Sequence, residues 1–153
     1  MKKTNKGFSM VELIIVIAIM AILAGALAPA LIKYINKSRI STDIQTGQTI
    51  ATAITTALSN ENAFDAAPSG TTAWSMHELV DGDLSGDSFK TEFASALGVS
   101  KAPTGKAKKD MQSGTMDQKF YIDLDAASNT IKVYVGAQDA DNEVYPNTGA
   151  NLK

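Results

Sequence analysis

The chain has 153 residues, a formal net charge of −2, 44% hydrophobic residues and no cysteine. That length allows one ordinary domain, or a smaller domain on a stalk. The lack of cysteine excludes a disulfide scaffold, a zinc–thiolate site, an iron–sulfur cluster and a cysteine nucleophile. Its mixed-sign charge argues against nucleic acid as a partner, because phosphate binding needs a concentrated basic face.

The hydrophobic residues are concentrated near the N-terminus. Residues 13–32 form a run of twenty positions without a charge, which as a helix is about 30 Å long and matches a bilayer core. The run follows three lysines, Lys2, Lys3 and Lys6. A secretory signal peptide cut near Ala28 or Ala30 is the alternative, but its apolar region would span only about 7 to 15 residues. We therefore predict a transmembrane helix.

Glu12 directly precedes this run. A charge at depth in a membrane costs about 3 kcal/mol and needs a partner. The carboxylate either sits at the membrane interface or waits for a cation that another molecule supplies. The surrounding residues decide between these interpretations.

Those residues read KGFSMVEL, from Lys6 to Leu13. The pattern resembles the class III signal of type IV prepilins: a short basic leader ending in glycine, then phenylalanine, then glutamate at the fifth position after the cut, then an apolar helix. Pro29 also stands where many pilins have a proline. The resemblance covers about the first third of the chain.

The resemblance implies a processing site and an assembly site. A prepilin peptidase would cut between Gly7 and Phe8, leaving residues 1–7 as the leader, and would methylate the new amine of Phe8. In assembly, that ammonium would neutralise Glu12 of a neighbouring subunit. The attraction between this ammonium and the Glu12 carboxylate is stronger where water is scarce.

The helical pattern continues beyond the membrane segment (8–32) into an amphipathic stalk over residues 33–59. Its apolar stripe, spaced at three and four residues, consists of Ile40, Ile44, Gly47, Ala51, Ile54 and Leu58. Polar residues, Asp43 among them, are expected on the other faces, and Gly47 is expected to make room for the head. A helix from Phe8 to Leu58 would be over 70 Å long.

Two residues inside the membrane half disfavour a regular helix. Proline removes one backbone hydrogen bond, so we expect a helix break at Gly25 and Pro29. One interpretation is a tolerated kink. The other, implied by the resemblance, is a segment that loosens when subunits pack into a filament.

Residues 60–153 are predicted to form a globular α+β head. A loop over 60–70 is followed by short helices near 72–80 and 88–97, the second capped by Asp87 and stopped by Gly98. Alternating runs at 120–124 and 131–135, joined by a turn-rich segment, predict an antiparallel hairpin. We expect a further strand at 143–145. We thus expect a long N-terminal helix packed on a small antiparallel β-sheet.

Many Gram-negative pilins close the head with a C-terminal disulfide, and this chain has no cysteine. The sequence therefore leaves open how residues 139–153 are held. It also makes a Gram-positive, clostridial-type pilin the most natural subfamily.

Four features of the head suggest chemistry. Residues 81–92 fit the spacing of an EF-hand calcium loop, but a solvated turn with Asp87 as helix cap is the favoured interpretation, and we predict no metal site. The basic run 101–109 lacks the interleaved aromatics of a base-stacking surface and is interpreted as a solvated loop. His77 is interpreted as a packing or surface residue. Asp123 and Asp125 share one side of a strand, and neither pocket nor partner follows from this.

We predict no enzyme and no cofactor. The resemblance implies the major subunit of a type IV pilus, serving motility, adhesion or biofilm formation. Its partners would be copies of itself, the peptidase that also methylates, and a membrane assembly platform. It would start as a single-pass membrane precursor and end in a surface filament. The alternatives are a pseudopilin of type II secretion, a minor tip adhesin and a membrane-anchored enzyme.

Overall fold

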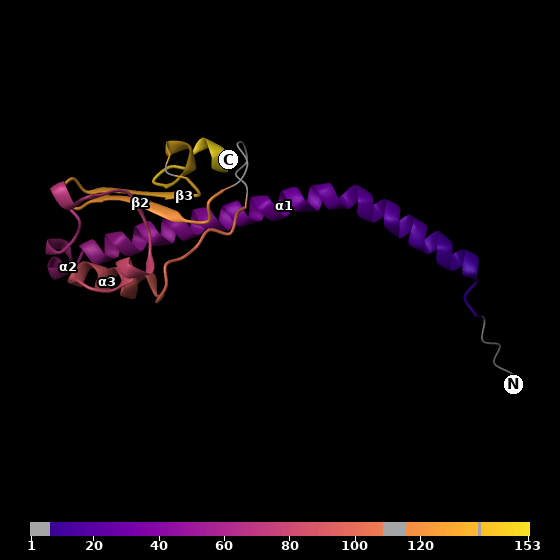
Figure 1. Cartoon of the computed structure of the whole chain (residues 1–153), viewed down its shortest axis with the longest axis horizontal. Helices are drawn as coiled ribbons and strands as arrows, with labels where there is room; N and C mark the ends of the chain where they lie inside the picture. The colour runs from indigo at the N-terminus through magenta and orange to yellow at the C-terminus, as the bar shows by residue number, and fades with distance from the viewer. Residues whose placement is uncertain (1–6, 109–115, 138) are drawn as a thin grey trace, which may run out of the picture. The chain divides into compact units, whose positions relative to one another are not determined.

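A computed structural model describes residues 7–108, 116–137 and 139–153. Residues 1–6 of the predicted leader and Lys109 of the basic run lie outside the described residues. The chain forms two compact units, Met1–Ile35 and Asn36–Lys153. Figure 1 shows the order of the elements along the chain.

The first element is α1, Met10–Leu58, which confirms the long N-terminal helix. It is continuous across Gly25 and Pro29. A helix tolerates a proline where other groups compensate for the lost hydrogen bond. The structure of this single chain therefore contains no break at these residues, and loosening in a filament remains a prediction.

The head contains one antiparallel sheet of four strands in the order β1-β2-β3-β4. Its strands are β1 (Trp74–Glu78), β2 (Phe120–Asp125), β3 (Thr130–Val135) and β4 (Glu143–Tyr145). The predicted hairpin is confirmed, with Phe120 opposite Val135 and Asp125 opposite Thr130. The predicted strand at the C-terminal end, β4, is confirmed as well.

The helix predicted over 72–80 is wrong, because β1 occupies most of that range. Trp74 pairs with Leu124 and Glu78 with Tyr121. The strand is irregular at Met76, where φ is +47°. There the Met76 N–H donates to the Asp123 carboxylate. Pairing with β2, a strand distant in sequence, overrides the local helical preference.

The loop predicted over 60–70 is also partly wrong, because it contains the short helix α2, Glu61–Asp65. The Asn60 side chain caps it, accepting from the backbone N–H groups of Asn62 and Ala63 at 3.1 and 3.4 Å. The second predicted helix is confirmed as α3, Ser88–Leu97. Asp87 caps it through the Lys90 N–H at 2.8 Å, and Gly98 ends it in the left-handed conformation.

The core lies between the second half of α1, α3 and the inner face of the sheet. Figure 1 shows β2 and β3 on one side of this half of α1 and α3 on another. The largest fully buried apolar side chains are Ile50, Ile54, Phe89, Phe93, Phe120, Ile122, Leu124, Val133, Val135 and Val144. Within the predicted stripe Ile40, Gly47, Ala51 and Ile54 are buried, and Ile44 and Leu58 are partly buried.

Two stalk residues show how closely the head packs on α1. A Cβ added to Gly47 would overlap Cγ2 of Val144, so this glycine makes room for β4 as expected. Asp43 is only 1% exposed, so its predicted place on an exposed face is wrong. It is buried because the head supplies hydrogen-bond donors to its carboxylate.

The C-terminal segment is held without a disulfide. Beyond β4 the Gly149 N–H donates to the Glu143 carbonyl at 2.8 Å, and the Asn147 N–H donates to the Glu143 carboxylate at 3.1 Å. Val144 and Leu152 are buried in the core. Strand pairing, local hydrogen bonds and two apolar anchors thus fasten the end of the chain.

Candidate functional site

The predicted cleavage site lies in non-helical chain just before α1. The side chain of Phe8 is 83% exposed. A Cβ added to Gly7 would meet nothing within 4 Å, so no part of the described structure covers this peptide. The Gly7–Phe8 bond is therefore open to a processing enzyme.

Glu12 has a partner within its own chain. Its carboxylate accepts the backbone N–H of Ser9 at 2.9 Å, while the Ser9 hydroxyl accepts the Val11 N–H at 3.3 Å. A serine cap and a glutamate three residues later resemble a capping box, which satisfies free N–H groups at a helix start. The sequence S-x-x-E signals this arrangement, which the interpretation of Glu12 from the sequence left out. Glu12 thus stabilises the first turn of α1 within its own chain.

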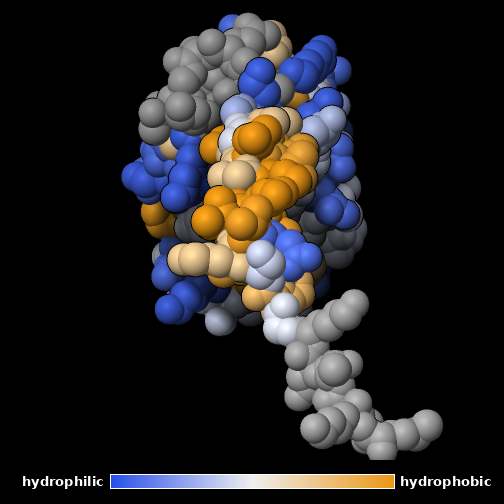
Figure 2. Space-filling view, turned by 90° about the vertical axis from the view of Figure 1, so that its right-hand side faces the viewer, coloured by the Kyte–Doolittle hydropathy of each residue, from blue (hydrophilic) through white to orange (hydrophobic). Residues whose placement is uncertain are grey.

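The first half of α1 presents an apolar surface on all sides. Figure 2 shows apolar side chains gathered into a nearly continuous patch. Large exposed apolar residues recur from Phe8 to Ile35, whereas the described part of the head exposes only Phe64, Val80 and Val99. Among the described helices α1 alone has the length and apolar composition to cross a membrane. So large an exposed apolar surface needs a lipid or protein environment.

The segment 81–92, which fits the spacing of a calcium loop, consists of a series of local contacts. Asp81 accepts the Ala102 N–H at 2.7 Å, Asp83 is buried and accepts from Val80 and His77, and Asp87 caps α3. No group of three acidic or histidine side chains that could hold a metal occurs among the described residues. The carboxylates are thus directed to separate protein partners.

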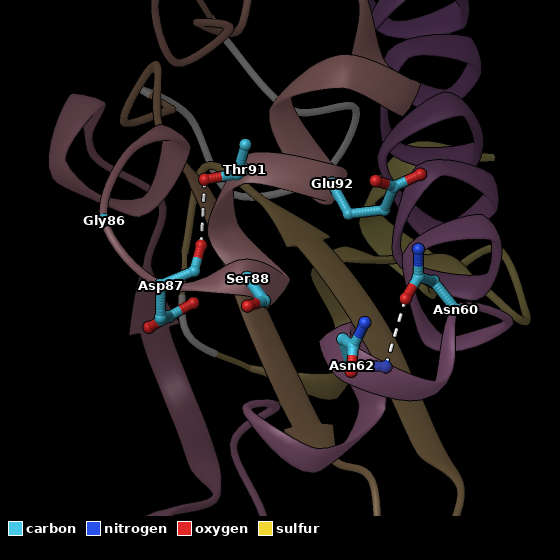
Figure 3. Close-up of a pocket in the computed structure, with 7 residues that line it drawn as sticks. All are labelled: Asn60, Asn62, Gly86, Asp87, Ser88, Thr91 and Glu92. Carbon is cyan, nitrogen blue, oxygen red and sulfur yellow. Dashed lines mark hydrogen bonds between the residues drawn. The ribbon is translucent and has the colours of Figure 1, made fainter.

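Part of this loop borders a polar depression of about 350 Å³. Its lining is Asn60, Asn62, Gly86, Asp87, Ser88, Thr91 and Glu92. Figure 3 shows Asp87 and Glu92 on opposite sides of the opening. The hydrogen bonds drawn there cap α2 and link Thr91 to the Asp87 carbonyl. These contacts belong to helix starts.

His77 has a packing role, as expected. Its ring stacks on Trp74 with centroids 4.4 Å apart, and Nε2 lies 2.9 Å from the buried Asp83 carboxylate. His77 therefore links β1 to the loop that follows it.

The strand aspartates Asp123 and Asp125 also have structural partners. Asp125 accepts the Gly70 N–H and the Ser128 hydroxyl, at 3.0 and 2.8 Å. Asp123 accepts the Tyr134 hydroxyl at 2.9 Å. Burial and this bond to Asp123 raise the pKa of the Tyr134 phenol. These carboxylates hold the outer face of the hairpin together.

The basic segment 101–108 is attached to the stalk helix. Asp43 accepts the Lys106 N–H with both carboxylate oxygens, at 2.7 and 2.9 Å, and the Ala107 N–H at 2.8 Å. Burial raises the pKa of Asp43, and the two backbone donors and the charge of Lys106 oppose that rise. The predicted solvated loop is thus fixed to α1, although its lysines remain exposed.

The comparisons with known proteins agree with the N-terminal pattern. Residues 2–28 match the prokaryotic N-terminal methylation motif. The chain is 36% identical over 97 residues to the type IV major fimbrial protein FimA of Dichelobacter nodosus, covering 61% of this chain and 58% of that protein. The match thus spans less than two thirds of that relative's length. No solved structure matches.

The comparisons do not bear on the Gram-positive subfamily, which stays a prediction. The chain thus carries the prokaryotic N-terminal methylation motif and is similar over part of its length to a type IV major fimbrial protein.

Proposed function

We propose that the chain is the major structural subunit of a type IV pilus and serves surface motility, adhesion or biofilm formation. The observation that carries this proposal is the methylation motif over residues 2–28, directly followed by an exposed apolar helix. The similarity to a major fimbrial protein supports a pilus subunit over a pseudopilin or a tip adhesin.

The precursor would be a single-pass protein of the cytoplasmic membrane, with residues 1–7 as leader and 8–32 as the span. A prepilin peptidase would cut before Phe8 and methylate its amine, and an assembly platform would move subunits into the filament. The open chain around Gly7 supports this order of events. In the filament, residues 33–59 would join the helical core to the head formed by 60–153.

Two charges would then fix the position of each subunit relative to its neighbour in the filament. Cleavage creates an ammonium on Phe8, one residue before the cap formed by Ser9. Once α1 leaves lipid for a helix bundle, this ammonium needs an anion, because an unpaired buried charge costs several kcal/mol. Glu12 of the neighbouring subunit would supply it, exchanging its contact with its own Ser9 N–H for an intermolecular one.

The capping contact makes a sharp test possible. In Glu12→Gln the side-chain carbonyl still accepts the Ser9 N–H, because glutamine also completes a capping box, but the charge is lost. In Ser9→Ala the charge is kept and the serine cap is lost. We expect Glu12→Gln to be inserted and cleaved but absent from sheared filaments, and Ser9→Ala to assemble.

The readouts are immunoblots of membrane and sheared surface fractions and the N-terminal residue of the recovered protein. Surface chains should begin at Phe8. Normal filament yield from Glu12→Gln together with loss in Ser9→Ala would show that Glu12 only caps the helix. Surface chains that retain Met1 or begin after Ala30 would refute the processing step.

A further inference from the structure

The Asn36–Lys153 unit carries four cationic side chains near the point where the chain enters it. Lys37 and Arg39 lie in its first helical turn, and Lys106 and Lys108 belong to the segment attached to Asp43. We name these four residues the basic collar. Residue 43 follows residue 39 by one helical turn on the same face, so the attachment brings both groups to one end of the unit.

The lysines of the collar are presented outward. Along residues 104–108 exposed and buried positions alternate, with Gly105 and Ala107 buried and Thr104, Lys106 and Lys108 exposed. Such alternation places the exposed side chains on one side of an extended segment. The buried carboxylate of Asp43 fixes the backbone of this segment, so the lysines are held at the surface of the unit.

No collar side chain forms an ion pair within the described part of the chain, although the charge of Lys106 acts on the buried carboxylate of Asp43. The ion pairs found there are His77–Asp83 and Lys119–Glu78. Two carboxylates adjoin the collar: Asp43 is buried under backbone donors, and Asp117, beside Lys108 in a surface depression, accepts the Tyr121 hydroxyl at 2.9 Å. Lys37, Lys106 and Lys108 are exposed and Arg39 is partly buried, so at least three of these cations face outward, where an external anionic partner could reach them.

Connectivity indicates where that partner lies. The charge-free run ends at Ile32, and the unit begins at Asn36, four residues later. Four residues of chain span about 14 Å even when fully extended. Whenever the run is in a bilayer, the end of the unit that holds the collar is therefore within reach of the lipid headgroups.

We propose that the basic collar binds anionic phospholipid headgroups and holds the head of the membrane-inserted subunit against the bilayer. Basic residues beside a membrane helix gain about 1 kcal/mol each from an anionic surface, which is roughly a fivefold change in occupancy per lysine. The inference rests on the membrane-inserted precursor of the proposed function. It adds to that function a lipid partner and a state in which the head lies against the bilayer.

A second copy of the chain is the competing partner, because residues 60–153 contain 14 acidic and 8 basic residues. Connectivity favours lipid, since headgroups adjoin the collar of every inserted subunit, whereas an acidic head must arrive from elsewhere. The two partners differ in their dependence on protein density, which the experiment uses.

The test uses the full chain in vesicles. The chain has no cysteine, so Thr104→Cys, at an exposed position in line with the collar lysines, accepts one fluorescent donor. Energy transfer to a headgroup acceptor then reports how often the segment lies at the membrane. We expect more transfer in vesicles of phosphatidylcholine mixed with phosphatidylglycerol than in phosphatidylcholine alone, with the difference lost at high salt.

Substituted chains locate the effect. Lys106→Gln and Lys108→Gln should each lower the ratio of docked to free heads roughly fivefold. Lys90→Gln on α3 and Lys132→Gln on β3 make the same charge change elsewhere and should leave the ratio unchanged. Lys106, Lys108 and Lys132 are exposed, so heads with these substitutions should unfold at the temperature of the unsubstituted head. Lys90 is partly buried and donates to the Gly82 carbonyl at 3.4 Å, so the unfolding temperature of Lys90→Gln is measured before it serves as a control.

Three outcomes would overturn the proposal: equal transfer with and without phosphatidylglycerol, no response to the collar substitutions, or transfer in phosphatidylcholine that rises with protein density. The last would assign the collar to a second copy. Co-flotation with vesicles after alkaline extraction is measured first. Failure to insert would refute the membrane segment of the proposed function, and insertion without docking would refute the collar alone.

Discussion

Replacing Gly47 by alanine tests how closely the head packs on α1. Alanine is the better helix former by about 1 kcal/mol, so an exposed site would gain stability. At Gly47, however, the new Cβ would overlap Cγ2 of Val144 and lie 3.1 Å from its Cβ and 3.6 Å from Cγ1 of Val133. Overpacking costs about 1–3 kcal/mol, and a direct overlap of this kind belongs in the upper part of that range, about 2–3 kcal/mol. We expect a net loss of about 1–2 kcal/mol.

The assay is urea unfolding of a fragment that begins at Asn36, followed by the fluorescence of Trp74. This fragment contains the compact unit with the shared core. A loss of this size should lower its melting temperature by about 4–8 °C. Gln48→Ala, at an exposed neighbour on the same helix, is the matched control and should be neutral or slightly stabilising.

A double substitution tests the proposed contact itself. Val144→Ala alone should cost about 2 kcal/mol through lost burial. In the double variant the new methyl group of residue 47 occupies part of the space that Val144→Ala vacates. The double variant should therefore lose less stability than the two single variants summed, by at least about 0.5 kcal/mol. If Gly47→Ala stabilises the fragment, or if the two costs simply add, β4 does not pack against Gly47 as described.

Three further predictions use the same fragment. Asp43→Ala should cost about 2–4 kcal/mol in urea unfolding, because the Lys106 N–H and a neighbouring buried N–H lose their acceptor; a neutral result would contradict the role of this carboxylate. The pKa of the Tyr134 phenol is raised above 10.0 by burial and by its bond to Asp123, so its contribution is full below pH 10.0 and is lost as the pH rises through the folded pKa. Tyr134→Phe should therefore cost about 1 kcal/mol at neutral pH and reduce the loss of stability in alkali, and an unchanged alkaline slope would refute the assignment. Calcium should leave the melting temperature unchanged, and a rise that Asp81→Ala abolishes would contradict the structural interpretation of that loop.

The N-terminal site could be predicted from the sequence because the signals on which that prediction rests are local. Gly7, Phe8 and Glu12 lie within six residues of one another, and the apolar run follows without interruption. The capping contact between Ser9 and Glu12 was equally local and was signalled by S-x-x-E. It is the part of the site that a closer inspection of the same residues would have found.

Much of the fold was predictable for the same reason. The limits of α1 and α3 and the β2–β3 hairpin follow from periodicity, from a cap and a stop beside each other in sequence, and from two alternating runs joined by a short turn. Each depends on residues that are neighbours along the chain. Their physical basis is backbone preference together with burial of one face.

Other features depended on partners distant in sequence. Residues 74–78 form a strand because they pair with β2, which lies more than forty residues later in the sequence. A helix at 74–78 could not make these hydrogen bonds to β2. Asp43 was expected in solvent because it is charged, yet it is buried because the N–H groups of Lys106 and Ala107 meet it. A carboxylate in sequence carries no sign of such donors. Only the tertiary structure, by bringing residues 43 and 106 together, decided that this charge would lie inside and that the basic segment would be fastened to the stalk.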